Sequence, residues 1–265
     1  MTKEKNEGRV SAWQKMKENR FLFSELVKRD FKKKYKRTYL GMVWSVLSPL
    51  LTLLIMRLVF TQFFGNDIPY YTTFLFCGNI VYSFFNDSTN GGMGSLLGNS
   101  AIFSKINVPK YLFLFSRTVS SLINFGLTFV VFLLFCVIDG VPFSFSMLAL
   151  PYPIVCLIIF NLGVGLILSA MFVFFRDVQY LWGVFTVLLQ YVSAIFYDPS
   201  RFGDYERLFL LNPVYVYIKY FRIAVIDGYL PSIQFHLLAL GYALFFFGVG
   251  ALIYKKFNHK FLYYV

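Results

Sequence analysis

Charged residues are scarce in this chain, and their scarcity excludes an ordinary water-soluble globule. Only 14% of the 265 residues are charged, whereas 58% are hydrophobic and 21% are aromatic. Soluble domains carry about 25% charged residues. A helix needs about 20 apolar residues to cross the roughly 30 Å hydrocarbon layer of a bilayer. The composition therefore predicts an all-α membrane protein.

The sequence also lacks the groups that enzymes and nucleotide-hydrolysing proteins need. It contains no Gly-x-x-x-x-Gly-Lys-Ser/Thr phosphate-binding loop. Its two histidines, His236 and His259, belong to no nucleophile–base or zinc-ligand pattern. The three cysteines lie in apolar runs without Cys-x-x-Cys spacing, so we interpret Cys77, Cys136 and Cys156 as buried thiols. We expect no catalytic site, metal site or cofactor in this chain.

What charge there is carries one sign and is concentrated at the start. The net charge is +12, and 13 of the 25 Lys and Arg residues fall within positions 1–37. Nucleic acid would be one partner for such a charge, but no base-reading motif accompanies it. The clustering instead favours a cytoplasmic arm lying against anionic lipid headgroups.

Within this arm, apolar residues recur every four positions. Because this period matches a helix with one apolar and one cationic face, residues 21–37 are expected to form an amphipathic helix in the membrane interface. Its apolar positions are Phe23, Val27, Phe31 and Tyr35.

Six apolar segments follow and predict six transmembrane helices. Their expected positions are near 42–64, 70–92, 111–138, 147–174, 179–197 and 233–254. With the amino terminus inside, 19 Lys and Arg residues fall on the cytoplasmic side and four on the outer side. Both termini are therefore expected in the cytoplasm, and we expect no cleavable signal peptide, because the first long apolar run begins only near Gly41. The predicted divisions are a cytoplasmic arm (1–40), a transmembrane domain (41–256) and a cytoplasmic tail (257–265).

Two connections differ from plain loops. A glycine-rich break at 91–98 is followed by a short amphipathic piece on the cytoplasmic side. Between the fifth and sixth segments, residues 198–231 contain two apolar pieces that are too short to cross, separated by Asn212-Pro213. This pattern predicts an outward re-entrant helical hairpin that is either buried in protein or lines a wet cavity.

Several short motifs occur together in a characteristic order. They are Arg29 to Trp44 followed by Ser48-Pro49-Leu50, then Ile106-Asn107-Val108-Pro109, Phe175-Arg176-Asp177-Val178, and Leu211-Asn212-Pro213 followed by Arg222. From about residue 20 onward the chain resembles a type 2 ABC exporter permease, in the branch that exports bacterial polysaccharides (O-antigen, capsule) and teichoic acids. The resemblance implies a homodimeric pore in the bacterial cytoplasmic membrane with two copies of a separate ATPase subunit, which would bind the ATP and magnesium. The implied substrate is a lipid-linked glycan.

This resemblance also gives two groups of residues expected roles. The piece at 95–108 is expected to be the main coupling helix contacting the ATPase, together with the Arg176-Asp177 turn; the residues are Leu96, Asn99, Ile102, Phe103, Lys105, Ile106, Arg176 and Asp177. Aromatic rings can stack on sugar C–H groups. We therefore interpret the ring-rich region 191–229 as a substrate pathway; the alternative is an ordinary interfacial aromatic belt. The pathway residues are Arg57, Phe60, Tyr191, Phe196, Tyr197, Tyr215, Tyr217, Lys219 and Arg222.

Other interpretations stay open. Arg57 could equally extend toward the outer interface without contacting substrate. Asp87 and Arg117, near the cytoplasmic ends of successive segments, are expected to form a structural ion pair. A drug or small-lipid exporter would share the architecture, and a glycosyltransferase or scramblase working without ATP is a further alternative.

Overall fold

The computed structural model describes residues 19–36, 38–64, 68–106 and 108–264. Residues 1–18 and Arg37, which hold much of the predicted basic arm, lie outside this part. The described residues form helices and no strand. The longer helices are α2 (Arg20–Tyr35), α3 (Trp44–Phe64), α4 (Tyr71–Met93), α6 (Tyr111–Ile138), α7 (Pro151–Phe174), α8 (Val178–Val192), α9 (Pro213–Arg222) and α10 (Ile233–Phe257). Shorter elements are η1 (Gly41–Val43), η2 (Leu97–Asn99), α5 (Ser100–Phe103), η3 (Phe145–Ala149), η4 (Pro199–Leu211), the π-helical turn η5 (Ile223–Asp227) and α11 (Phe261–Tyr264).

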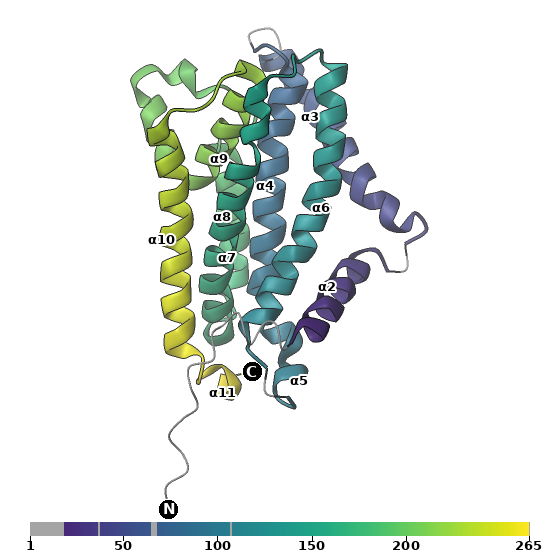
Figure 1. Cartoon of the computed structure of the whole chain (residues 1–265), viewed down its shortest axis with the longest axis vertical. Coiled ribbons are helices and arrows are strands. Elements are labelled where there is room, and N and C mark those ends of the chain that lie inside the picture. The colour runs from purple at the N-terminus through teal and green to yellow at the C-terminus, as the bar shows by residue number, and fades with distance from the viewer. Residues whose placement is uncertain (1–18, 37, 65–67, 107, 265) are drawn as a thin grey trace, which may run out of the picture.

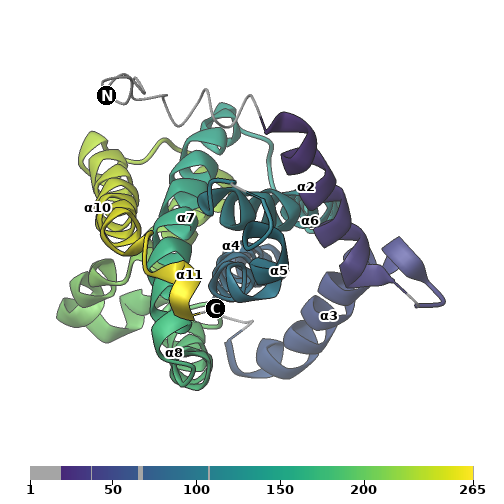
Figure 2. The same cartoon turned by 90° about the horizontal axis from the view of Figure 1, so that it is seen from below.

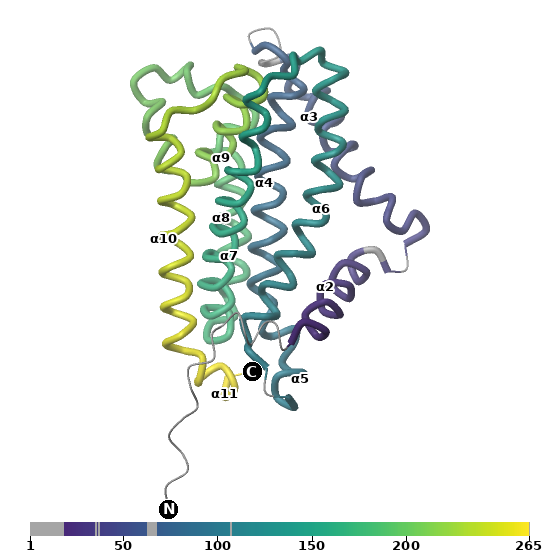
Figure 3. The backbone as a smooth tube through the Cα atoms, viewed as in Figure 1, coloured from purple at the N-terminus to yellow at the C-terminus, as the bar shows by residue number. Residues whose placement is uncertain are grey.

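The long helices form a bundle around α4. Figures 1 and 2 show α6, α7 and α10 running alongside one another, with α4 in the middle and α3 on the far side of α4 from α10. Helix α7 packs chiefly on α10 and α4, while α4 also contacts α6, α3, α8 and α9. Three buried cysteines lie in α4, α6 and α7, as the sequence predicted. The tube in Figure 3 shows that α2 leaves the bundle direction and crosses its lower edge beside α6.

Glycines set the distance between α7 and α10. A Cβ atom on Gly163 would lie 2.4 Å from the carbonyl carbon of Phe246, and one on Gly250 would lie 2.5 Å from the carbonyl oxygen of Gly163. Both distances are too short for a Cβ atom, so only glycine fits at these two positions. Close approach through small residues is a common way for membrane helices to gain van der Waals contact.

Among the residues that the structure describes, four helical segments are long and apolar enough to cross a bilayer: Gly41–Gln62, Tyr111–Ile138, Phe145–Phe174 and Ile233–Phe257. A fifth is counted if Pro199–Leu211 and Pro213–Asp227, which meet at a bend of 119°, are taken as one span. Helix α8 has only 15 residues, and α4 is interrupted by polar side chains. The all-helical membrane fold is thus confirmed, while the count of six and the re-entrant hairpin stay predictions.

One end of the bundle, which we call the basic end, carries α2, α5 and α11 (Figure 1). Helix α2 packs against α6, and its buried side chains among the described residues are Leu26 and Asp30, which are 3% and 7% exposed. The predicted apolar positions Phe23, Val27 and Phe31 lie half-buried beside this contact, and the side chain of Tyr35 lies outside the described part. The apolar face of α2 is therefore partly used against protein, because α6 offers it a packing surface.

Candidate functional site

A polar stripe runs along α4. Asn79, Ser83, Asn86 and Asn90 are spaced by four, three and four residues, which places them on one helix face, with Asp87 beside them. Ser83 donates a hydrogen bond to the Asn79 side chain at 3.4 Å, and the Asn90 amide donates to the Asn86 side-chain oxygen at 2.7 Å. Sequence patterns did not single out this stripe, because α4 was interpreted as a plain apolar crossing. Its 4-3-4 spacing is the signal that could have revealed it.

One cavity opens on the side of the stripe that faces α8. It has a volume of about 450 Å³ and is bounded by Thr52 and Met56 of α3 and by Thr186 and Gln190 of α8. The hydroxyl of Tyr82 donates to the carbonyl oxygen of Thr186 at 2.6 Å, which fixes α8 against α4. This wall holds neutral amide and hydroxyl groups together with the carboxyl group of Asp87.

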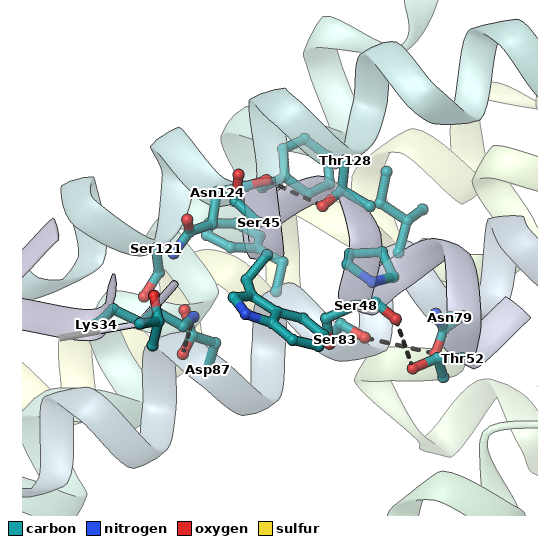
Figure 4. Close-up of a pocket in the computed structure, with 16 residues that line it drawn as sticks. Lys34, Ser45, Ser48, Thr52, Asn79, Ser83, Asp87, Ser121, Asn124 and Thr128 are labelled. Carbon is teal, nitrogen blue, oxygen red and sulfur yellow. Dashed lines mark hydrogen bonds and ion pairs between the residues drawn. The ribbon is translucent and has the colours of Figure 1, made fainter. Parts of the chain in front are cut away.

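A second cavity opens on the side that faces α6, and Figure 4 shows it. Its volume is about 460 Å³, and Thr52, Asn79, Ser83 and Asp87 line both cavities. Polar groups of α3, α4 and α6 therefore line the space between these helices. Further polar lining comes from Ser45, Ser48, Ser121, Asn124 and Thr128.

At the basic end an ion pair borders this second cavity. Lys34 of α2 and Asp87 of α4 are 3.0 Å apart, with side-chain exposures of 37% and 29%. The predicted partner of Asp87 was Arg117, and within the described ranges no ion pair joins the two. Arg117 instead lies over Gly91, where an added Cβ would come within 2.3 Å of its Nε. Asp87 pairs with Lys34 because α2 folds back beside α4, and the sequence spacing between Asp87 and Arg117 gives no information on where α2 lies.

Aromatic rings lie toward the opposite end of the α3–α8 gap. The rings of Phe60 and Phe196 stack with centroids 4.3 Å apart, and the Tyr191 ring lies 5.8 Å from that of Phe196. Three predicted pathway residues are thus brought together from α3, the end of α8 and the segment that follows α8. Tyr191 remains 58% exposed, and Arg57 is exposed on α3.

The other predicted pathway residues lie in packed surroundings. Tyr215 is 2% exposed, and Tyr217 is fully buried with its hydroxyl donating to the Ala239 carbonyl oxygen at 2.9 Å. Arg222 is 7% exposed. Such burial does not favour contact between these three side chains and a substrate, because helix packing already occupies their surfaces.

Two predicted pathway residues are bonded but still accessible. Lys219 pairs with Glu206 at 2.7 Å, and Tyr197 donates to the Tyr191 carbonyl oxygen at 2.9 Å. Both side chains are only partly buried.

The predicted coupling residues divide into anchors and an exposed set. Leu96, Asn99 and Phe103 are buried, and the Phe103 ring contacts that of Phe113 with centroids 5.9 Å apart. Ile102 is half-buried. These residues hold α5 and the segment before it against α6. Lys105, Ile106, Arg176 and Asp177 are exposed at the basic end, where another protein could reach them.

The chemistry available at the α4 stripe is hydrogen bonding. Asn, Ser, Thr and Gln supply both donors and acceptors without a nucleophile–base pair. In the described ranges, no group of three His, Cys, Asp or Glu side chains is arranged to hold a metal ion. The site can therefore exchange weak hydrogen bonds with a hydroxyl-rich molecule along its length.

Comparison with known proteins adds an independent line of evidence. The family model described as ABC-2 type transporter matches residues 22–226. The chain is 28% identical over 258 residues to the O-antigen export system permease protein RfbA of Klebsiella pneumoniae, covering 93% of this chain and 97% of that protein. It is 26% identical to the protein of the same name from Myxococcus xanthus, covering 81% and 84%. It is 24% identical to the polysialic acid transport protein KpsM of Escherichia coli, covering 77% and 81%.

Proposed function

The chain belongs to the ABC-2 type transporter family, and from this premise we propose that it is the transmembrane permease subunit of an ATP-driven exporter of a lipid-linked polysaccharide. The cargo class is O-antigen, capsular polysaccharide or teichoic acid, moved across the bacterial cytoplasmic membrane. The similarity to O-antigen export permeases over nearly the whole chain supports this cargo.

The polar stripe of α4 is the structural observation that carries the proposal. Polar side chains are costly in hydrocarbon, so a row of them in a membrane helix is retained where it faces protein or a wet cavity. Here the row borders two cavities between α3, α4, α6 and α8. Neutral hydroxyl and amide groups suit a sugar chain, because they can exchange hydrogen bonds with passing hydroxyls without holding any one of them tightly.

The proposed topology has six crossings, with the basic end in the cytoplasm. Helices α3, α4, α6, α7 and α10 cross, and α8 with the segment after it forms the fifth crossing in chain order. The bent pair of η4 and α9 then forms an outward re-entrant hairpin. The bonding of Tyr242 of α10 to the carbonyl oxygen of Leu210 at 3.0 Å, well inside the span, supports a hairpin that enters the membrane. Residues 1–40 and 257–265 are the cytoplasmic arm and tail.

Energy is proposed to come from two copies of a separate ATPase subunit, which bind the ATP and magnesium. Their contact surface is the exposed set Lys105, Ile106, Arg176 and Asp177. Because Phe103 fixes α5 to the first turn of α6, movement of this surface would be transmitted directly to α6 and, through the α4–α6 packing, to the stripe. Two copies of this chain would enclose the pathway between their α3, α4 and α8 helices.

The aromatic cluster at the opposite end of the pathway is proposed to guide the emerging glycan. Tyr191 offers an exposed ring that is tilted by 45° against Phe196, and Phe196 in turn stacks on Phe60. Arg57 on the same side could contact phosphate or anionic sugar groups.

A drug or small-lipid exporter is the alternative with the same architecture, and an ATP-independent glycan enzyme or scramblase is a further one. The test is to co-express this chain with its proposed ATPase subunit in cells that lack their own glycan exporter. We expect glycan at the cell surface, export that stops when the ATPase cannot hydrolyse ATP, and ATP turnover by the purified pair that responds to glycan. Recovery of the chain without any ATPase, or turnover that responds to a drug and not to glycan, would contradict the proposal.

A further inference from the structure

A separate cavity lies at the basic end, away from the α4 stripe. It has a volume of about 770 Å³, within the usual range for ligand-binding pockets. Its walls come from the start of α6 and the last turns of α10, with Leu166 of α7 also lining it. We call it the α6–α10 cavity. None of the proposed pathway or coupling residues lines it.

The mouth of this cavity is cationic. Lys110, Lys255 and His259 line it, and no Asp or Glu is among the described lining residues. The Lys110 ammonium donates one hydrogen bond to the carbonyl oxygen of Asn258 at 2.6 Å and lies 5.7 Å from the centroid of the Phe103 ring. Burial lowers the pKa of Lys110, so a nearby anion would stabilise its charged form.

Much of the cavity lining is apolar. Phe115, Leu166, Phe247 and Ala251 form its hydrophobic lining. Tyr254 also lines it and is 6% exposed, and its buried hydroxyl has no hydrogen-bond partner among the described residues. A buried hydroxyl without a partner is unfavourable, because the hydrogen bonds it made to water are not replaced. The Tyr254 hydroxyl is therefore a donor that a molecule bound in this cavity could use.

We infer that the α6–α10 cavity binds one anionic phospholipid from the cytoplasmic leaflet. The phosphate would meet Lys110 and Lys255, and the Tyr254 hydroxyl would donate to an acyl ester carbonyl oxygen, since Tyr254 lines the same cavity as both lysines. The acyl chain would lie along Phe115, Phe247 and Ala251. Charge complementarity selects the headgroup, because basic pockets between membrane helices on the cytoplasmic side are suited to anionic lipid headgroups. The bound lipid would bridge α6 and α10 and so stabilise this end of the bundle.

The test uses the full-length chain in a neutral detergent, titrated with dioleoyl phosphatidylglycerol and followed by native mass spectrometry. Dioleoyl phosphatidylcholine, which has the same acyl chains, is the headgroup control. We expect one tightly held phosphatidylglycerol, and about fivefold weaker binding for Lys255→Gln. Lys256→Gln is the matched control, because Lys256 carries the same charge at the next position and does not line the cavity. It should bind like the unaltered chain.

Two further variants keep the test independent of charge. Ala251→Phe should fill the cavity and abolish the tightly held lipid. Tyr254→Phe should weaken lipid binding while leaving the lipid-free protein equally or more stable, because it removes an unpaired hydroxyl. Equal binding of both lipids, equal effects of Lys255→Gln and Lys256→Gln, or an unchanged stoichiometry in Ala251→Phe would overturn the inference. So would displacement of the lipid by glycerol phosphate alone, tighter binding of a polyprenyl phosphate, or lipid binding that appears only after residues 1–18 are deleted.

Discussion

The Arg222 guanidinium lies on the face of Phe74, with its central carbon 3.4 Å from the ring centroid. The same guanidinium donates hydrogen bonds to the carbonyl oxygens of Ile195 at 3.0 Å and Phe74 at 3.4 Å. Gly78 lies directly beside it, where an added Cβ would be 3.3 Å from Nη2. One buried side chain thus joins α9 to α4 and to the segment that follows α8.

Arg222→Ala is expected to destabilise the protein by about 3 kcal/mol, because it removes the donor that pairs the buried Ile195 carbonyl oxygen and opens a cavity beside Phe74. Arg222→Lys should rescue little, since an ammonium cannot both stack on the ring and reach two acceptors. Unfolding in a denaturing detergent, followed by circular dichroism, measures this. Lys219→Gln, on the same helix, breaks only a partly exposed ion pair and should change stability by less than about 1 kcal/mol. Equal effects at both positions would refute the structural role of Arg222.

Gly250→Ala should weaken the α7–α10 contact by about 1–3 kcal/mol, because the added methyl would meet backbone atoms of α7 that cannot move aside. Gly248→Ala, two residues away on the same helix, is the control, since nothing lies within 4 Å of its added Cβ. We expect the control to be neutral or slightly stabilising, because alanine favours helix over glycine. Thermal unfolding of the purified variants distinguishes them, and a neutral Gly250→Ala would contradict the described packing.

Asn86→Leu is expected to lower glycan export at least tenfold while leaving the amount of assembled protein unchanged. Leucine removes hydrogen-bonding groups from the middle of the α4 stripe, whereas Asn86→Gln keeps them and should retain most export. Surface glycan, measured by antibody or lectin binding and normalised to protein in the membrane, is the readout. Full export in the leucine variant would show that the stripe is not the pathway.

Ile106→Glu should disrupt binding of the ATPase subunit, because it places a carboxylate on an apolar side chain that is 48% exposed at the proposed contact surface. Leu230→Glu, at the opposite end and 61% exposed, is the matched control and should leave binding intact. Co-purification of the ATPase with each variant gives the answer. Retention of the ATPase by Ile106→Glu at the level of the control would remove Ile106 from the interface.

Reversing the ion pair tests whether Lys34 and Asp87 hold α2 against the bundle. Each single change, Lys34→Asp or Asp87→Lys, should reduce export by setting like charges together, and the double reversal should restore part of it. The pair is partly exposed, so the coupling free energy is expected to be below about 1 kcal/mol. A double-mutant cycle in the export assay measures it, and purely additive losses would mean that the pair does not matter for transport.

Composition and apolar runs were enough to predict an all-helical membrane protein, because lipid leaves few other ways to satisfy the backbone. The motifs around Arg29 to Trp44 and Asn212-Pro213 indicated the family, and the family match over residues 22–226 agrees. Lys105, Ile106, Arg176 and Asp177 are exposed, and their role in docking the ATPase stays a prediction.

The tertiary structure decided which polar groups meet. Sequence spacing suggested Asp87 with Arg117, but α2 folds back across the bundle and brings Lys34 to Asp87 from 53 residues away. Arg222 looked like a substrate contact, yet packing of α9 on α4 buries it against Phe74. The sequence by itself determined that this chain is a membrane protein, because the hydrophobicity of a segment is a sum over its residues and needs no knowledge of the fold. Which face of α4 borders a cavity, and which cation is buried, depend on how separate helices dock, and no local pattern carries that information.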